Sequence, residues 1–226
     1  MSDSKVRPDV RSEPEEPGDY ALVFSVPPLC LHDHEPDSRV ITRIDVEIVC
    51  DVDPQSGFVS DTIPVGSALA YRIDGDECSE RGWSLWDACD AFEQETTDYC
   101  EVLFGRKNWW TPEVEAMCPD VWSANLLILS EVRIDPAHRG KRLGLRAARV
   151  LMDLFPVPGG LVACLPRPMR KPERATPGML VKDDEGTKSA IRALTQYWGR
   201  MGFQPLGETG YCVLDPALRA PRLNDL

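Results

Sequence analysis

Alternating apolar positions predict three β-strands in the first third of the chain. The segments 21–26, 39–52 and 62–73 carry valine, isoleucine and leucine at spacings near two, which is the period of a strand with one buried face. Pro64 and Gly66 interrupt the third segment and predict a bulge or an edge start there, because proline cannot donate a ladder hydrogen bond. We expect these strands to begin a sheet.

A helical spacing replaces the alternation over 85–104. One face of this segment is apolar, with Leu85, Cys89, Phe92, Tyr99 and Leu103. Ser84, with Asp87 three residues further on, predicts the N-cap of the helix. The surrounding segment 74–101 carries ten acids against the single base Arg81, which indicates a solvated helix face. The alternative is an acidic wall that attracts a cationic substrate.

The second half of the chain alternates strand and helix signals. A strand-like run at 126–134 leads through a basic, glycine-bearing turn into an amphipathic helix, and a short apolar strand follows at 159–166. A strand, a helix and a strand in this order predict a parallel pair. A further helix at 187–201 and two short strands within 203–216 complete the pattern. We interpret 107–122 as a loop with a short helical turn.

The order of these elements predicts one α+β domain over residues 19–216, with a mixed central sheet flanked by helices. Residues 1–18 are rich in proline, serine, aspartate and glutamate, so we expect a disordered acidic tail there. Residues 217–226 are expected to form a polar C-terminal tail. The proline- and charge-rich connection 166–186 is expected to be a functional loop.

Charge and cysteine usage exclude several classes of protein. The formal net charge of −12 at pH 7 argues against general affinity for nucleic acid or an anionic membrane. No apolar run reaches the roughly 20 residues of a membrane span, and the N-terminus lacks the apolar core of a signal peptide. Eight cysteines are scattered without a CxxC pair. We therefore expect reduced, buried thiols in a cytoplasmic protein, and no metal site.

The basic turn at 139–144 is the strongest candidate for a binding site. It lies where a helix begins, and a helix N-terminus exposes unpaired N–H groups at the positive end of the helix dipole. Glycine allows an anion to approach closely, and arginine and lysine add charge, so the turn predicts a phosphate site. Neither the GxxxxGK[ST] loop nor the GxGxxG fingerprint is present, which disfavours the common nucleotide-binding folds.

The stretch VRIDPAHRGKRLGLRAARVLM, residues 132–152, resembles the cofactor-binding motif of the GNAT superfamily of N-acetyltransferases. In that family a strand leads into R/Q-x-x-G-x-G/A and then a helix. Arg139, Arg142 and Gly144 occupy the three motif positions, so Arg142 replaces the middle glycine. The later segment ALTQYWGRMGFQPL resembles the family's helix that ends in a Gly-Phe pair. The two matches cover about 126–216 and imply the acyl-CoA N-acyltransferase fold.

The resemblance implies acetyl-CoA as the cosubstrate. Its pyrophosphate would lie over the turn, on the backbone amides of Arg139, Gly140, Lys141, Arg142, Leu143 and Gly144. Its pantetheine arm would pair with the backbone near Val132 and Ile134, as a strand adds to an exposed sheet edge. An amine acceptor, either a small molecule or a protein amine, would then attack the thioester directly.

Two residues are candidates for proton transfer in such a reaction. Strand alternation places Glu131 on the opposite face from Val132 and Ile134, where its carboxylate could take the amine proton through a water. The alternative is an exposed glutamate, or one paired with a neighbouring arginine. The family's acidic tyrosine falls on Trp198 here. Tyr197, one residue earlier, could serve as the acid or could be a packing residue.

Three functions remain open from the sequence. The leading one is an acetyl-CoA-dependent N-acetyltransferase, and the second is a catalytically silent GNAT-like module that binds CoA or a protein partner. A nucleic-acid binder that uses the stripe Arg142, Arg146 and Arg149 and the basic cluster 167–174 ranks last, because it would act against the overall charge. The acidic segment 74–101 favours a cationic acceptor. The sequence does not determine the oligomeric state.

Overall fold

The N-terminal strands form where the alternating pattern predicts them. The computed structural model describes residues 20–26, 40–51, 62–105, 108–168, 185–218 and 220–226. The predicted tail 1–18 and most of the predicted loop 166–186 lie outside these residues. The first strands are β1 (Tyr20–Ser25), β2 (Ile41–Asp51) and β3 (Thr62–Ile73).

The later elements follow the predicted order of strand, helix and strand. Between β3 and β4 lie α2 (Gly75–Glu80), α3 (Leu85–Phe92), α4 (Gln94–Leu103) and α5 (Pro112–Met117). The unit around the basic turn comprises β4 (Leu126–Ile134), η2 (Pro136–His138), α6 (Leu143–Leu154) and β5 (Leu161–Cys164). The last elements are α7 (Glu185–Gly199), β6 (Gln204–Pro205), β7 (Cys212–Leu214) and η4 (Leu223–Asp225).

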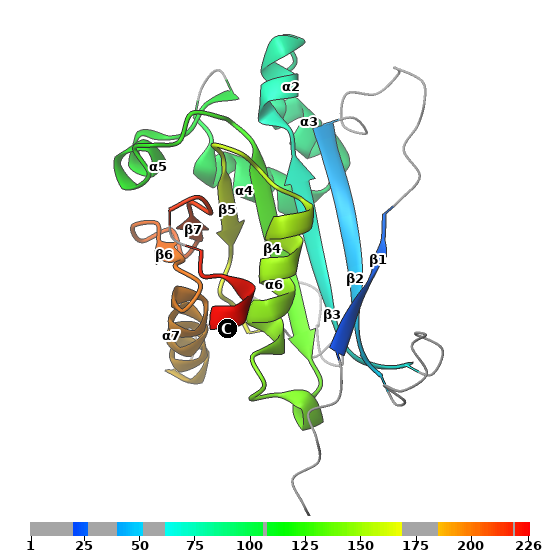
Figure 1. The fold of residues 1–226 in the computed structure, drawn as a ribbon. Helices are drawn as coiled ribbons and strands as arrows, with labels where there is room; N and C mark the ends of the chain where they lie inside the picture. The colour runs from blue at the N-terminus through cyan, green and yellow to red at the C-terminus, as the bar shows by residue number, and fades with distance from the viewer. Residues whose placement is uncertain (1–19, 27–39, 52–61, 106–107, 169–184, 219) are drawn as a thin grey trace, which may run out of the picture.

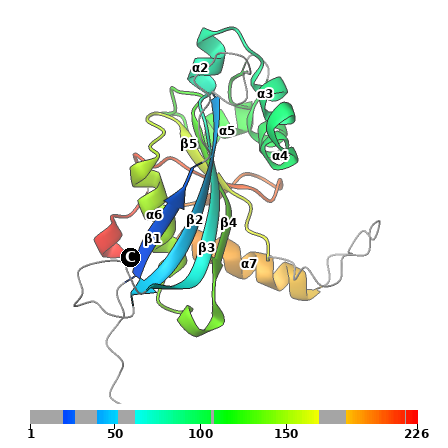
Figure 2. The ribbon, with the colours of Figure 1, turned by 90° about the vertical axis from the view of Figure 1, so that its right-hand side faces the viewer.

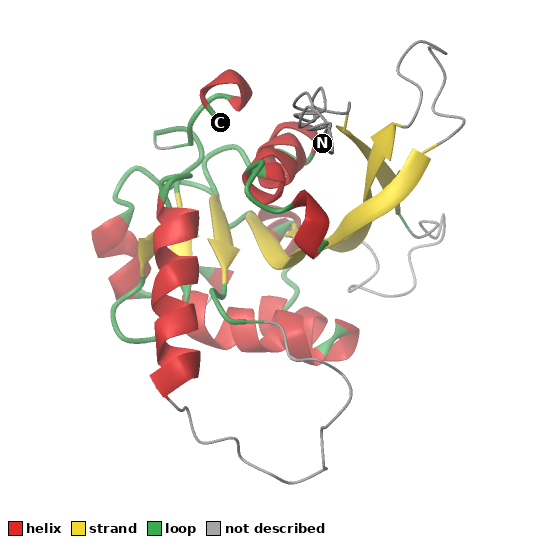
Figure 3. Cartoon of the chain, turned by 90° about the horizontal axis from the view of Figure 1, so that it is seen from below, coloured by secondary structure: helices red, strands yellow, loops and turns green. Residues whose placement is uncertain are grey.

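One mixed sheet of seven strands joins these elements in the order β1-β2-β3-β4-β5-β7-β6 (Figure 1). β4 and β5 are parallel, as the sequence predicts, and the other neighbouring strands are antiparallel. Figure 2 shows the sheet edge-on, with α6 on one side and α3 and α4 on the other. Seen from below, the strands lie between these helices (Figure 3). The predicted α+β class with a mixed, helix-flanked sheet is confirmed.

Each face of the sheet has its own apolar core because successive side chains of a strand point to opposite faces. On β4, Leu126 and Ile128 pack towards α2–α5, whereas Leu127 and Leu129 pack towards α6. Helix α7 adds the buried Trp198 to the α6 side. The described cysteines are buried, as predicted, apart from the partly buried Cys50.

The predicted irregularity in the third strand is confirmed. Gly66 pairs with Ile48 and Pro64 pairs with Val49, so Val65 is the extra residue of a bulge. A bulge adds one residue to one strand and bends it. The sheet therefore bends at the position where proline and glycine interrupt the alternation.

A second irregularity lies on β4, next to the candidate functional site. Ser130 is the extra residue where the register between β3 and β4 shifts. On the other side of β4, pairing with β5 ends at Leu129 and Cys164. β4 continues to Ile134, so its last residues have no β5 partner. We call this point the β4–β5 divergence.

The predicted single helix over 85–104 is wrong, because the chain breaks it at Glu93. Glu93 is extended, with φ −163° and ψ 144°, and separates α3 from α4. Its carboxylate accepts a hydrogen bond of 2.7 Å from the hydroxyl of Tyr71 and lies 3.4 Å from Nη1 of Arg43. These contacts with the sheet accompany the break, and they depend on residues that are distant in sequence.

The start of α3 is as predicted, since Oγ of Ser84 accepts a hydrogen bond from the backbone of Asp87 at 3.1 Å. Helix α2 is not predicted by the sequence pattern. Its N-cap is Asp74, which accepts from the backbone N–H of Glu77 at 3.0 Å. A predicted helical turn within 107–122 is confirmed as α5.

Candidate functional site

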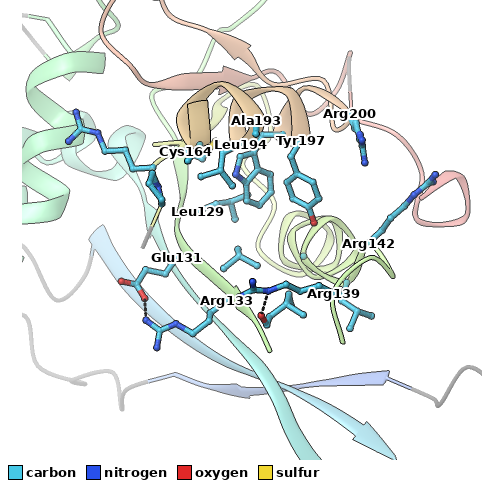
Figure 4. Close-up of a pocket in the computed structure, with 18 of the residues that line it drawn as sticks. Leu129, Glu131, Arg133, Arg139, Arg142, Cys164, Ala193, Leu194, Tyr197 and Arg200 are labelled. Carbon is cyan, nitrogen blue, oxygen red and sulfur yellow. Dashed lines mark hydrogen bonds and ion pairs between the residues drawn. The ribbon is translucent and has the colours of Figure 1, made fainter. Parts of the chain in front are cut away.

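A cleft of about 730 Å³ opens at the β4–β5 divergence. The end of β4, the turn before α6, the end of β5 and helix α7 line it (Figure 4). Because β4 lacks a β5 partner beyond Leu129 in the described residues, its backbone edge faces the cleft. Such an edge can pair with an extended, amide-bearing ligand.

The cleft is locally basic in an acidic protein. Five arginines line it, namely Arg133, Arg139, Arg142, Arg167 and Arg200. Among its described lining residues, Glu131 is the only acid. This charge distribution favours an anionic ligand, even though the chain carries a net charge of −12.

The basic turn has a conformation that presents backbone to the cleft. Gly140 has a φ of 84° and Arg142 a φ of 57°, so both lie in the left-handed region that glycine adopts most easily. Arg142 is the N-cap of α6 and stands where the family motif has its middle glycine. Its Nη1 donates to the carbonyl oxygen of Leu226 at 3.2 Å, while Nε of Arg139 donates to the Ile134 carbonyl at 2.9 Å.

All the residues that the sequence analysis assigns to a cofactor or to proton transfer line this cleft except Lys141. The Nζ atom of Lys141 donates to the hydroxyl of Tyr20 at 2.6 Å and lies 5.3 Å from the centre of that ring. The side chain therefore binds to β1. Its backbone amide remains part of the turn.

The first turn of α6 and Tyr197 of α7 approach each other closely. A Cβ atom added at Gly144 would lie 2.7 Å from the Tyr197 hydroxyl and 3.3 Å from Cγ1 of Val132. Figure 4 shows the Tyr197 ring reaching from α7 towards α6. Burial raises the pKa of Tyr197, so the phenol stays protonated at neutral pH. The proposed acid role of Tyr197 stays a prediction, and its hydroxyl lies against the helix N-terminus.

The strand faces of Glu131, Val132 and Ile134 are as predicted. Val132 and Ile134 pack against the α6 side, whereas Glu131 lies opposite Leu69, which packs against the α2–α5 side. The Glu131 side chain is 53% exposed, and one of its oxygens lies 4.0 Å from Nη2 of Arg133. The predicted alternative of an arginine-paired glutamate thus describes its geometry, and a role as base remains a hypothesis.

Sequence reasoning missed a second carboxylate, Glu95 of α4, which lies near the β4 bulge. Burial raises its pKa, and the negative charges of Glu93, Glu131 and Asp98 raise it further. The Ser130 hydroxyl offsets part of this shift, although Ser130 Oγ is buried without a hydrogen bond of standard geometry. The divergence therefore has an acidic side, towards α4, and a basic side, towards α6 and α7.

The raised pKa of Glu95 predicts a measurable effect on stability. Its folded pKa exceeds its unfolded value, so folding loses stability as the pH rises through the folded pKa. Glu95→Gln should therefore increase the melting temperature at pH 7, and the gain should disappear at about pH 3, where both states are protonated. Thermal unfolding of the two proteins across this pH range measures the effect. A less stable variant at pH 7 would contradict it.

No family model, curated protein or solved structure matches the chain. The mixed seven-stranded sheet with helices on both faces is compatible with a GNAT-like fold. In the part of the chain that the structure describes, no helix is long and apolar enough to cross a membrane. The same residues contain no group of three or more His, Cys, Asp or Glu that could hold a metal ion.

Proposed function

We propose that the protein is an acetyl-CoA-dependent N-acetyltransferase that moves an acetyl group to a primary amine in the cytoplasm. The observation that carries the proposal is the basic cleft at the β4–β5 divergence, with a helix N-terminus at one end. Along one wall of the cleft runs the part of β4 that has no β5 partner in the described residues. A diphosphate needs convergent N–H donors and positive charge, and a pantetheine arm needs an exposed strand edge. The N-terminus of α6 with its arginines and the edge of β4 lie within one cleft.

Each part of the cleft would bind a different part of acetyl-CoA. The first-turn amides of Leu143 and Gly144 have no intrahelical partner, as at any helix N-terminus, and would hold the pyrophosphate together with Arg139 and Arg142. The β4 backbone near Val132 would hold the pantetheine amides. The thioester would then lie near the divergence, where an amine could reach it.

The direct test is an assay for release of CoA thiol from acetyl-CoA. The acceptor panel would contain spermidine, a peptide with a free N-terminus and a lysine-containing peptide. The proposal predicts amine-dependent thiol release and acetylation of one acceptor by mass spectrometry. Binding of acetyl-CoA without turnover on any member would support the silent module instead.

One observation keeps that second function in consideration. Trp198 stands where the family has its acidic tyrosine, and it is buried in the α6-side core. The Tyr197 hydroxyl lies against Gly144. In an active enzyme the thiolate would therefore leave unaided or take its proton from another group.

Arg142→Ala should weaken acetyl-CoA binding by about 10-fold, or about 1.4 kcal/mol, because it removes a charge-assisted contact with the diphosphate. Arg146→Ala is the matched control, since Arg146 is exposed on the same helix and is not among the described lining residues of the cleft. Isothermal titration of both variants measures the difference. Equal affinities of the two variants for acetyl-CoA would show that Arg142 does not contact the diphosphate.

A further inference from the structure

The first strand contacts the basic turn through a cluster of three polar side chains. Nζ of Lys141 donates to the hydroxyl of Tyr20 at 2.6 Å, and the same hydroxyl lies 3.3 Å from Nδ1 of His138. The rings of Tyr20 and His138 also meet edge to face, with 6.0 Å between their centres. The start of β1 is therefore joined to the turn by residues that are 118 positions apart in sequence.

This cluster decides which nitrogen of His138 carries the proton. The Tyr20 oxygen already accepts from the Lys141 ammonium, which polarises the O–H bond and makes the phenol a better donor. Within the described residues, Nδ1 of His138 is the acceptor that this hydroxyl meets. A neutral imidazole whose Nδ1 accepts a hydrogen bond has its proton on Nε2. The contacts therefore favour the Nε2–H tautomer of His138.

The Nε2–H group of His138 remains for a ligand. The half-buried His138 lines the cleft next to Arg139, whereas Tyr20 is not among the described lining residues. Nε2 has no hydrogen-bond partner in the described part of the chain. An N–H donor beside the basic turn and the start of α6 suits an anionic oxygen, because hydrogen bonds to charged acceptors are the stronger ones.

We infer that His138 donates a hydrogen bond from Nε2 to the diphosphate of acetyl-CoA, and that Tyr20 positions it for this contact. The inference rests on the proposed function and deepens it, since it adds a neutral side-chain donor to the backbone amides and arginines. Tyr20 acts through His138, because it holds the ring and fixes the tautomer. Without the Tyr20 hydroxyl, part of the molecules would carry the imidazole proton on Nδ1, and these would lack the donor.

Nitrogen-15 NMR of the free, full-length protein tests the tautomer. The chain has three histidines, and the signals that disappear in His138→Ala are those of His138. At about pH 8, where imidazole is neutral, the wild type should show a protonated Nε2 and an unprotonated Nδ1. Tyr20→Phe should show a mixture of the two tautomers. A wild-type His138 with its proton on Nδ1 would overturn the inference.

Isothermal titration of acetyl-CoA at the same pH tests the contact with the ligand. His138→Ala should weaken binding about 10-fold, because it removes a hydrogen bond to a charged group. His138→Gln should stay within about 3-fold of the wild type, since its amide nitrogen can take the place of Nε2. The shorter amide of His138→Asn reaches only as far as Nδ1, so this variant should bind as weakly as His138→Ala. Ala137→Ser is the matched control, because Ala137 is exposed in the same turn and is not among the described lining residues.

Dephospho-CoA identifies the phosphate group that His138 contacts. It keeps the diphosphate of CoA and lacks the 3′-phosphate. His138→Ala should lose affinity for dephospho-CoA by the same factor as for acetyl-CoA. Equal binding of dephospho-CoA by the wild type and His138→Ala would contradict a contact with the diphosphate.

The variants at His138 also separate a hydrogen bond from a packing role. If the ring only packs, His138→Gln and His138→Asn lose the same affinity for acetyl-CoA, and the inference is overturned. If His138→Ala binds acetyl-CoA as tightly as the wild type, the inference is overturned and the cofactor site stands. If the wild type does not bind acetyl-CoA, the proposed function fails and the inference fails with it.

Discussion

Gly144→Glu is expected to reduce acetyl-CoA affinity by about 100-fold or more, which is about 2.7 kcal/mol. The new carboxylate would stand at the N-terminus of α6, where it would repel the diphosphate and occupy its place. A Cβ at this position would lie 2.7 Å from the Tyr197 hydroxyl, so a side chain there must also displace Tyr197. Isothermal titration of wild type and variant measures the loss.

Gly144→Ala separates the steric effect from the charge. It adds the same Cβ without a carboxylate, and should therefore weaken binding much less than Gly144→Glu. Combining it with Tyr197→Phe removes the hydroxyl that the Cβ meets and should restore part of the lost stability. Circular dichroism checks that each variant is folded. A folded Gly144→Glu variant that binds acetyl-CoA as well as the wild type would exclude the turn as a pyrophosphate site.

Asp76→Ala is expected to cost about 3 kcal/mol of the free energy of unfolding, which corresponds to a fall of about 6–12 °C in melting temperature. Asp76 joins α2 to the residues that lead into β4. Its Oδ1 accepts from the backbone of Ala124 at 2.9 Å, and its Oδ2 accepts from Ser123 Oγ at 2.8 Å and Asn125 Nδ2 at 3.1 Å. Removing the carboxylate leaves these donors unpaired, and Ser123, Ala124 and Asn125 are buried.

Asp90→Ala provides the control for this prediction. Asp90 is an exposed acid of α3, and an exposed acid contributes little to stability. Its variant should unfold within about 0.5 kcal/mol of the wild type. Chemical denaturation of both variants measures the difference. Equal midpoints would mean that the Asp76 network is replaced by water without loss.

The sequence predicts those parts of the fold that depend on local periodicity. β1, β2 and β3 follow the alternation, and the Val65 bulge follows from the neighbouring proline and glycine. The parallel pairing of β4 and β5 follows from the helix between them. The break at Glu93 could not be predicted, because it involves contacts with Tyr71 and Arg43 on the sheet.

In the candidate site, too, local features can be predicted from the sequence and contacts between distant segments cannot. The turn from Arg139 to Gly144 is continuous in sequence, so a motif can identify it. Arg167 and Arg200 reach the cleft from elements far along the chain, and no spacing rule connects them to the turn. Glu95 is one of ten acids in the segment 74–101. Only burial and the position of the β4 bulge distinguish it from the rest.

The conformation of Arg142 explains how the turn tolerates its departure from the family motif. At φ 57° the residue takes a left-handed conformation at the N-cap of α6, which costs a non-glycine residue about 1–2 kcal/mol. The guanidinium contact with the Leu226 carbonyl adds a hydrogen bond that glycine could not make. The turn therefore combines a left-handed backbone at Arg142 with a positive charge.

Titration of acetyl-CoA into the wild-type protein tests the central claim most directly. The account predicts one binding site per chain, with an affinity that falls as the salt concentration rises, because arginines and a helix N-terminus hold the diphosphate. It also predicts that Gly144→Glu loses this binding while it remains folded. Absence of binding by the wild type would contradict the account, and so would binding that neither salt nor Gly144→Glu affects.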